Sequence, residues 1–202
     1  MTQLSARTLD IDTPSGPAHV VLTRRGDRGL FVVGHGAGGG IDAPDIVAVS
    51  SALVTQGWTV ARVVQPYRVK GHRAPERSPR LDAAWLAVLD GLRKERKNRR
   101  LVVSGRSSGA RVAVRTADEV QADGVVALAF PLHPPGKPEK SRAEEIGALE
   151  APLLVVQGAR DAFGTAAELP PGTNVVEVPG DHSLKQDTGA VAAAVVEWLD
   201  QL

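Results

Sequence analysis

Short runs of consecutive apolar residues alternate along the chain with longer stretches in which apolar residues recur every three or four positions. The short runs are continuously apolar rather than alternating, so they predict strands buried on both faces, as in a parallel sheet. They occupy residues 30–33, 59–64, 101–104, 125–130, 153–157 and 174–178. The longer stretches predict helices on both faces of that sheet.

The first residues and the helix starts complete this pattern. Residues 8–11 and 18–23 flank a Pro-Ser-Gly-Pro turn and predict an antiparallel hairpin at one edge of the sheet. Asp42 is expected to cap a helix that carries Pro44 in its first turn, and Ser78 with Pro79 gives the same start signal. Another helix is expected over residues 188–202. The pattern therefore indicates an α/β fold, with a single domain over residues 1–202.

Composition narrows the classes of protein. The chain has no cysteine, which excludes disulfide frameworks, thiolate zinc sites and cysteine nucleophiles, and fits a reducing compartment. Residues 1–12 lack the apolar core of a signal peptide, and no apolar run is long enough to cross a bilayer. We expect a cytoplasmic protein that does not contact the membrane.

The formal charge of +1 gives no overall field that would attract nucleic acid. A basic run from Arg93 to Arg100 is an alternative, local nucleic-acid patch. No aromatic residue is interleaved with it, so we interpret it as the solvated end of the helix that precedes it. No nucleic-acid partner is expected.

The pentapeptide at residues 105–109, GRSSG, matches G-x-S-x-G between a predicted strand and a predicted helix. In that context glycines permit a sharp turn that holds the serine hydroxyl out at the edge of the sheet. Ser107 is therefore the candidate nucleophile. The alternative is an ordinary glycine-rich turn in which Ser107 caps the helix.

A serine nucleophile needs an imidazole base, and that base needs an acid to orient it. Asp161 follows the strand at 153–157, and His182 follows the strand at 174–178. Both should emerge at the same sheet edge as Ser107, in the chain order Ser, Asp, His. Asp161 as a helix cap and His182 as a surface histidine are the alternatives, and Asp181 is a weaker candidate for the acid.

The segment GHGAGGG at residues 34–40 directly follows the strand at 30–33. Its glycines allow backbone N–H groups to approach an oxyanion, and we assign the donors to Ala37 and Ser108. His35 is expected to hold this loop by hydrogen bonds. The alternative, a nucleotide phosphate cradle, lacks the Gly-Lys-Ser/Thr ending of a P-loop, although its glycines satisfy G-x-G-x-x-G.

Two long polar segments, residues 65–80 and 131–140, follow strands and are expected to wall the site. Candidate substrate-binding residues are Gly36, Gly38, Arg106 and His133. A preference for anionic substrates is suggested by Arg106 next to Ser107 and by four basic residues of the first segment, Arg68, Lys70, His72 and Arg73. Pairing of Arg106 with a neighbouring carboxylate is the alternative.

With these motifs the chain resembles the α/β-hydrolase superfamily, in its small, lid-poor branch related to dienelactone hydrolases. Within that branch it resembles the family of testis-expressed protein 30 and NSL-complex subunit 3, on residues 35–38, 105–111, 130–137 and 180–183. The resemblance implies eight strands, the second antiparallel, with nucleophile, acid and histidine after strands five, seven and eight. This sequence itself departs by leaving little room for a cap domain.

These observations predict a serine hydrolase that cleaves an ester-like bond of a small-molecule substrate through Ser107, Asp161 and His182. They imply no metal and no organic cofactor. The alternative is a binding or scaffold protein that keeps the fold without turnover.

Overall fold

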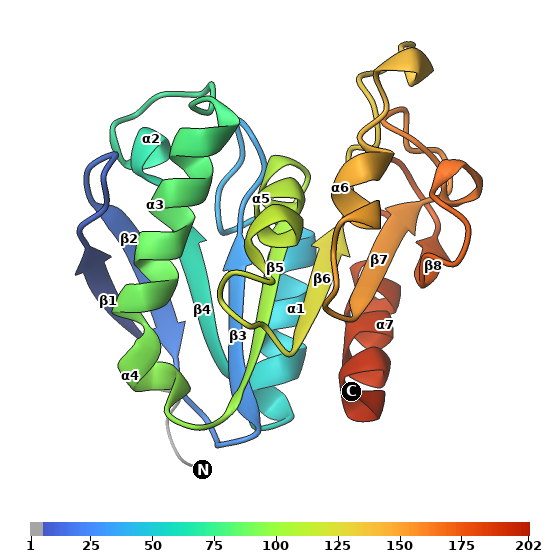
Figure 1. Cartoon of the computed structure of the whole chain (residues 1–202). Helices are drawn as coiled ribbons and strands as arrows, with labels where there is room; N and C mark the ends of the chain where they lie inside the picture. Colours follow the sequence, from blue (N-terminus) through green and yellow to red (C-terminus); the bar gives the residue numbers. More distant parts are fainter. Residues whose placement is uncertain (1–5) are drawn as a thin grey trace.

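The computed structural model describes residues 6–202, which form an eight-stranded sheet in the order β1-β2-β4-β3-β5-β6-β7-β8 (Figure 1). β2 is antiparallel to both β1 and β4, and the remaining pairs are parallel. The predicted mostly parallel sheet is confirmed. Residues 1–5, the start of the polar N-terminal segment, lie outside the described residues. The strands are β1 (Ala6–Ile11), β2 (Ala18–Thr23), β3 (Gly29–Gly34), β4 (Thr59–Val64), β5 (Arg100–Arg106), β6 (Gly124–Leu128), β7 (Leu153–Gly158) and β8 (Val175–Val178).

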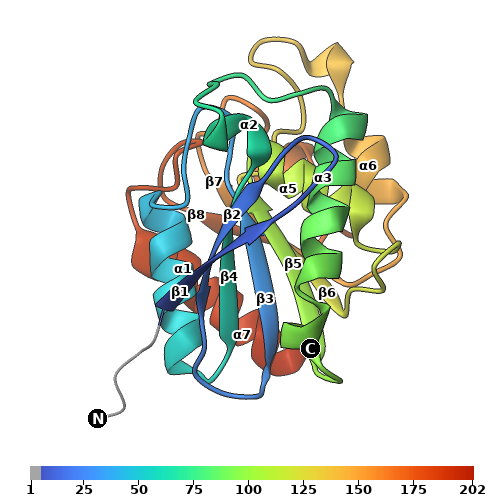
Figure 2. The same cartoon turned by 90° about the vertical axis from the view of Figure 1, so that its left-hand side faces the viewer.

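Helices cover both faces of the sheet. α1 (Pro44–Thr55) and α7 (Thr188–Gln201) pack together on one face, and α3 (Ser78–Gly91) and α5 (Ser108–Thr116) pack on the other. Figure 2 views the sheet from its β1 edge, with α1 on one side and α3 on the other. The short helices are α2 (Pro66–Val69), α4 (Arg93–Arg96), α6 (Ala143–Gly147), η1 (Pro138–Lys140) and η2 (Ala166–Glu168).

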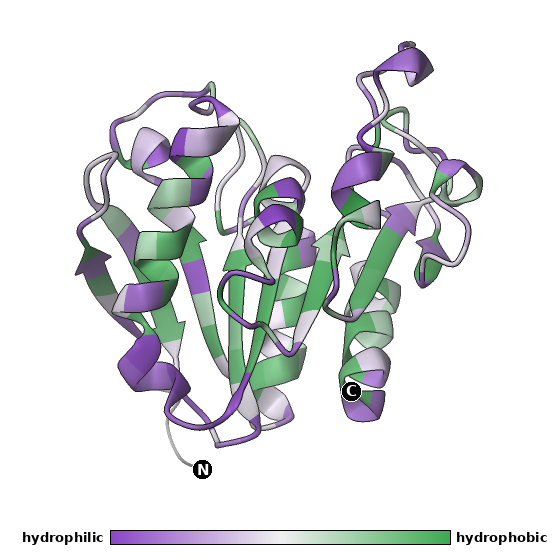
Figure 3. Ribbon diagram, in the orientation of Figure 1, coloured by the Kyte–Doolittle hydropathy of each residue, from purple (hydrophilic) through white to green (hydrophobic). Residues whose placement is uncertain are grey.

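Successive residues of the central strands enter two separate cores. In β3, Leu30 and Val32 pack under α3 and α5, whereas Phe31 and Val33 pack under α1 and α7. The hydropathy colouring shows the same strands apolar along most of their length (Figure 3). This two-sided burial is why these strands read as continuous apolar runs in the sequence.

Both proline-marked helix starts lack the expected side-chain cap. The N-cap of α1 is Ala43 rather than Asp42, and Asp42 instead pairs with Arg62 at 3.3 Å. α3 begins at Ser78 itself, with Arg77 as its N-cap. Proline supplies a helical φ and has no N–H to satisfy, so each helix starts without a capping side chain.

The basic run from Arg93 to Arg100 spans α4 and the turn before β5. Its acidic member, Glu95, is buried and pairs with Arg7 at 2.5 Å and with Arg24. Part of the run therefore joins α4 to the edge hairpin. The sequence analysis expected a solvated helix end, whereas Glu95 within this run is buried and paired.

Loops that follow β3, β4, β6 and β7 gather at one edge of the sheet, at the top of Figure 1. The connection from β6 to β7 carries only η1 and α6, so residues 6–202 contain no separate cap domain over this edge. No helix in the described range is long and apolar enough to span a membrane.

Candidate active site

Ser107 occupies a sharp turn between β5 and α5. Its backbone φ is 53° and its ψ is −116°, a conformation that costs a non-glycine residue about 1–3 kcal/mol. A Cβ on Gly105 would lie 2.2 Å from the carbonyl carbon of Gly109, and a Cβ on Gly109 would lie 2.7 Å from the His35 carbonyl oxygen. Close packing therefore requires glycine at both ends of this turn.

The structure brings the side chains of Ser107, His182 and Asp161 into one chain of hydrogen bonds. Ser107 Oγ lies 2.8 Å from His182 Nε2, and His182 Nδ1 lies 2.7 Å from Asp161 Oδ2. The three residues follow β5, β8 and β7, as the sequence order predicts. With its Nδ1 proton donated to the carboxylate, the imidazole presents Nε2 as an acceptor to the serine hydroxyl.

Asp161 is only 3% exposed, and its two oxygens accept hydrogen bonds from several donors. Oδ1 accepts from the Phe163 N–H at 2.8 Å, and Oδ2 accepts from Gln157 Nε2 at 2.9 Å as well as from His182. A buried carboxylate held in this way keeps one orientation. The sequence analysis missed Gln157, whose signal is a polar residue near the end of an apolar strand.

Phe163 and Asp181 also adjoin His182. The Phe163 ring stacks on the imidazole, with ring centroids 4.1 Å apart and 28° between the planes. The Asp181 carboxylate instead accepts from the Ser183 hydroxyl at 2.6 Å and from the Ser183 N–H at 2.9 Å. These Ser183 contacts lower the pKa of Asp181. The geometry favours Asp161 over Asp181 as the partner of His182.

His35 holds the glycine loop that follows β3. Its Nδ1 donates to the Gly36 carbonyl oxygen at 2.9 Å, and its Nε2 accepts from the Gln65 N–H at 3.1 Å. Burial lowers the pKa of His35, which favours the neutral imidazole that these contacts require. The side chain therefore anchors the loop, in the role that its position in the sequence suggested.

The Gly36 carbonyl oxygen also accepts from the Gly39 N–H at 3.1 Å. The carbonyl and N–H of a trans peptide point in opposite directions. Fixing the Gly36 oxygen therefore fixes the direction of the Ala37 N–H on the other side of the same peptide. His35 thus acts on Ala37 through this peptide plane.

The glycine loop lies against the nucleophile turn. A Cβ on Gly36 would lie 3.2 Å from Ser107 Cβ. The N–H groups of Ala37 and Ser108 have no hydrogen-bond acceptor within residues 6–202, whereas the Gly38 N–H donates to the Arg73 carbonyl at 3.1 Å. The two free N–H groups therefore belong to the two segments that meet at Ser107.

Arg106 is engaged by protein groups rather than turned outward. Its Nε lies 3.2 Å from Asp45 Oδ2, and its Nη2 donates to the His182 carbonyl oxygen at 3.0 Å. The side chain is 15% exposed. Pairing with a neighbouring carboxylate, the alternative raised by the sequence, is what the structure contains.

His133 is the other candidate for substrate binding with an ionisable side chain, and it lies in the loop that follows β6. Its Nδ1 lies 2.9 Å from the Pro134 carbonyl oxygen, and its Nε2 lies 3.1 Å from Glu168 Oε1. The Pro134 carbonyl and the Glu168 carboxylate raise the pKa of His133. These contacts tie the loop to η2 and occupy both ring nitrogens.

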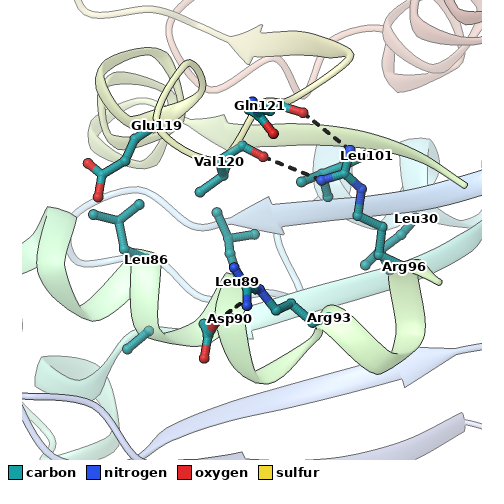
Figure 4. A pocket seen from close by; sticks show the side chains of 11 residues that line it. Leu30, Leu86, Leu89, Asp90, Arg93, Arg96, Leu101, Glu119, Val120 and Gln121 are labelled. Atoms are coloured by element: carbon teal, nitrogen blue, oxygen red, sulfur yellow. Dashed lines mark hydrogen bonds and ion pairs between the residues drawn. The ribbon is translucent and has the colours of Figure 1, made fainter. Parts of the chain in front are cut away.

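A cavity of about 420 Å³ lies at the opposite edge of the sheet, near the starts of β3 and β5 (Figure 4). Arg96 donates to the Val120 and Gln121 carbonyl oxygens, and Arg93 pairs with Asp90 at 3.0 Å. Both arginines thus have partners on this chain, and the lining of the cavity includes no serine or histidine. The chemistry gathers at the other edge, around Ser107.

The family described as an alpha/beta hydrolase domain matches residues 27–193, a span that holds all three side chains of the hydrogen-bonded chain. The protein belongs to the α/β-hydrolase family. Its strand order and the positions of Ser107, Asp161 and His182 after β5, β7 and β8 agree with the fold that the sequence resemblance implied.

Solved structures share this α/β-hydrolase fold at low sequence identity. XC6422 from Xanthomonas campestris, described as a serine hydrolase without a lid, has a TM-score of 0.77 at 20% identity, over 96% of this chain and 95% of that one. Est1E from Butyrivibrio proteoclasticus with ferulic acid bound has a TM-score of 0.79 at 18% identity, over 96% and 98%. A dienelactone hydrolase from Anabaena variabilis has a TM-score of 0.78 at 18% identity, over 98% of both chains.

Proposed function

We propose that this α/β hydrolase is a serine hydrolase that cleaves an ester-like bond in a carboxylic ester, thioester or lactone. The observation that carries the proposal is the pair of hydrogen bonds that joins Ser107 to His182 and His182 to Asp161, at 2.8 Å and 2.7 Å. A serine on a fixed turn, beside an imidazole oriented by a carboxylate, is the arrangement that activates a hydroxyl for attack.

In the first half-reaction, Ser107 Oγ attacks the carbonyl carbon and its proton moves to His182 Nε2. The carbonyl electron pair moves onto oxygen, and Asp161 stabilises the imidazolium that forms. When the tetrahedral intermediate collapses, the bond to the leaving group breaks and the leaving group takes the proton from Nε2. The acyl group remains on Ser107.

In the second half-reaction, a water molecule attacks the acyl carbon and gives a proton to His182 Nε2. Collapse releases the acid, and the proton returns to Ser107 Oγ. One water is consumed for each bond cleaved. We assign the stabilisation of both oxyanions to the Ala37 and Ser108 N–H groups, which have no other acceptor in the part of the chain that the structure describes. Each such donor contributes about 3 kcal/mol to the transition state.

Several comparisons support an ester-like substrate. Structures that share the fold include an esterase, Pf2001 from Pyrococcus furiosus, and a dienelactone hydrolase from Anabaena variabilis, at 17% and 18% identity to this chain. A small-molecule substrate and a cytoplasmic location remain predictions from the sequence. So does membership of the narrower family of testis-expressed protein 30 and NSL-complex subunit 3.

The test is turnover of a panel of short-chain and long-chain esters, a thioester and a lactone. We expect hydrolysis of at least one substrate class, with kcat reduced by about 10³-fold or more in Ser107→Ala. Ser141→Ala removes an exposed hydroxyl in another loop and serves as the matched control. A folded wild type that turns over none of the panel would favour the non-catalytic scaffold.

A further inference from the structure

Asp45 and Arg106 form a buried ion pair directly behind the nucleophile turn. Asp45 is the second residue of α1, and Arg106 is the last residue of β5, next to Ser107. The Asp45 side chain is 0% exposed, and its Oδ2 lies 3.2 Å from Arg106 Nε. Within residues 6–202, Arg106 is the one cationic side chain within 4 Å of this carboxylate.

The same guanidinium contacts both segments that surround Ser107. Arg106 Nη2 donates to the His182 carbonyl oxygen at 3.0 Å. Arg106 Nη1 would lie 3.2 Å from a Cβ on Gly36, so the glycine loop packs against it. The Arg106 side chain thus starts beside Ser107, binds the backbone of His182 and contacts the glycine loop that carries Ala37.

Burial makes the pair costly to separate. Burial raises the pKa of Asp45, and the adjacent Arg106 counteracts that rise. Arginine stays protonated in proteins, so loss of the pairing would leave a buried charge without compensation. Arg106 is therefore unsuited to leave Asp45 for a substrate carboxylate.

We infer that the Asp45–Arg106 pair is a positioning device that fixes the backbone of His182 relative to Ser107, and that Arg106 is not a substrate-binding residue. The inference rests on the proposed roles of Ser107 and His182. Arg106 adjoins Ser107 in the chain and binds the His182 carbonyl, so it sets both ends of the Oγ to Nε2 contact. A displacement of about 1 Å at such a contact reduces the rate by about 100-fold.

The test uses the double variant Arg106→Met with Asp45→Asn, which removes the guanidinium without leaving a buried carboxylate charge. Arg115→Met with Asp82→Asn is the matched control, because that pair is also largely buried and lies at the far end of α5. The readouts are the rate of inactivation by a fluorophosphonate, kcat and KM for a neutral ester, and hydrogen exchange across residues 180–186.

We expect the Arg106/Asp45 variant to fold, to lose about 10- to 100-fold in inactivation rate and kcat, and to retain KM within about twofold. Exchange across residues 180–186 should accelerate in this variant alone. Arg106→Lys keeps the charge beside Asp45 without the planar guanidinium. Its inactivation rate and kcat should lie between those of wild type and those of the double variant.

Wild-type inactivation rates and exchange in the double variant would overturn the inference. So would a loss confined to an ester that bears a carboxylate, which would return Arg106 to substrate binding. If wild type itself fails to react with the fluorophosphonate, the proposed function fails. Hydrogen exchange then still decides whether the pair fixes the His182 segment.

Discussion

At the scale of single residues, both oxygens of Asp161 accept hydrogen bonds, from His182 and Gln157 on one side and from the Phe163 N–H on the other. Asp161→Asn places an amide N–H₂ against a donor in either orientation and favours the wrong imidazole tautomer. We expect kcat to fall by about 10⁴-fold with the fold retained, as measured by ester turnover and circular dichroism.

Asp181→Asn is the control for this prediction, since Asp181 binds Ser183 rather than the imidazole. It should leave kcat within a few-fold of wild type. The opposite pattern, a large loss at Asp181 and none at Asp161, would contradict the assignment of the acid.

His35 gives a prediction about pH. Its pKa in the folded protein is below the ordinary value of 6.5, so the unfolded chain binds more protons as the pH falls below 6.5. The His35 contribution to the free energy of unfolding is therefore complete above pH 6.5 and declines as the pH falls through the window below it. Urea unfolding at pH 8 and pH 5.5 should show a smaller decline for His35→Ala than for wild type, and equal declines would contradict the account.

The residues of the site differ in how far sequence alone can predict them. Ser107 lies in a local motif, and Asp161 and His182 follow predicted strands, so parallel topology was enough to bring them to one edge. Asp45 carries no such signal, and the signal of Gln157 is only a polar residue near the end of an apolar strand. Arg106, the partner of Asp45, is distant in the chain, so only the packing of α1 against the site makes that contact. Gln157 lies four residues before Asp161, but its inward direction depends on the turn after β7.

At the scale of elements, the β5–turn–α5 unit depends on close contact between Gly105 and Gly109. A Cβ on Gly105 would lie 2.2 Å from backbone, which cannot move aside as a flexible side chain would. Gly105→Ala should lower the free energy of unfolding by about 3 kcal/mol, measured by denaturant titration. A Cβ on Gly147 would have no atom within 4 Å, so Gly147→Ala should change the free energy of unfolding by less than about 0.5 kcal/mol.

The same elements show where hydrophobic patterning succeeds and where it fails. Strands buried on two faces, such as β3 and β5, were predicted to within one or two residues of their observed ends because burial dictates their composition. The residues that cap the helices were predicted less well than the helix starts themselves. Asp42 pairs with Arg62 instead of capping α1, since the proline of the first turn makes a cap unnecessary.

At the scale of the whole molecule, the sheet order places the C-terminal ends of β3, β5, β7 and β8 around one edge, and the loops from those strands supply every group of the proposed mechanism. The central claim is that Ser107 is a nucleophile activated by His182.

Mass mapping of the adduct after reaction with a fluorophosphonate tests this claim most directly. The account predicts one phosphonyl group per chain, on the peptide that contains Ser107, and none in Ser107→Ala. A folded wild-type protein that carries the adduct on another residue, or that carries none, would contradict it.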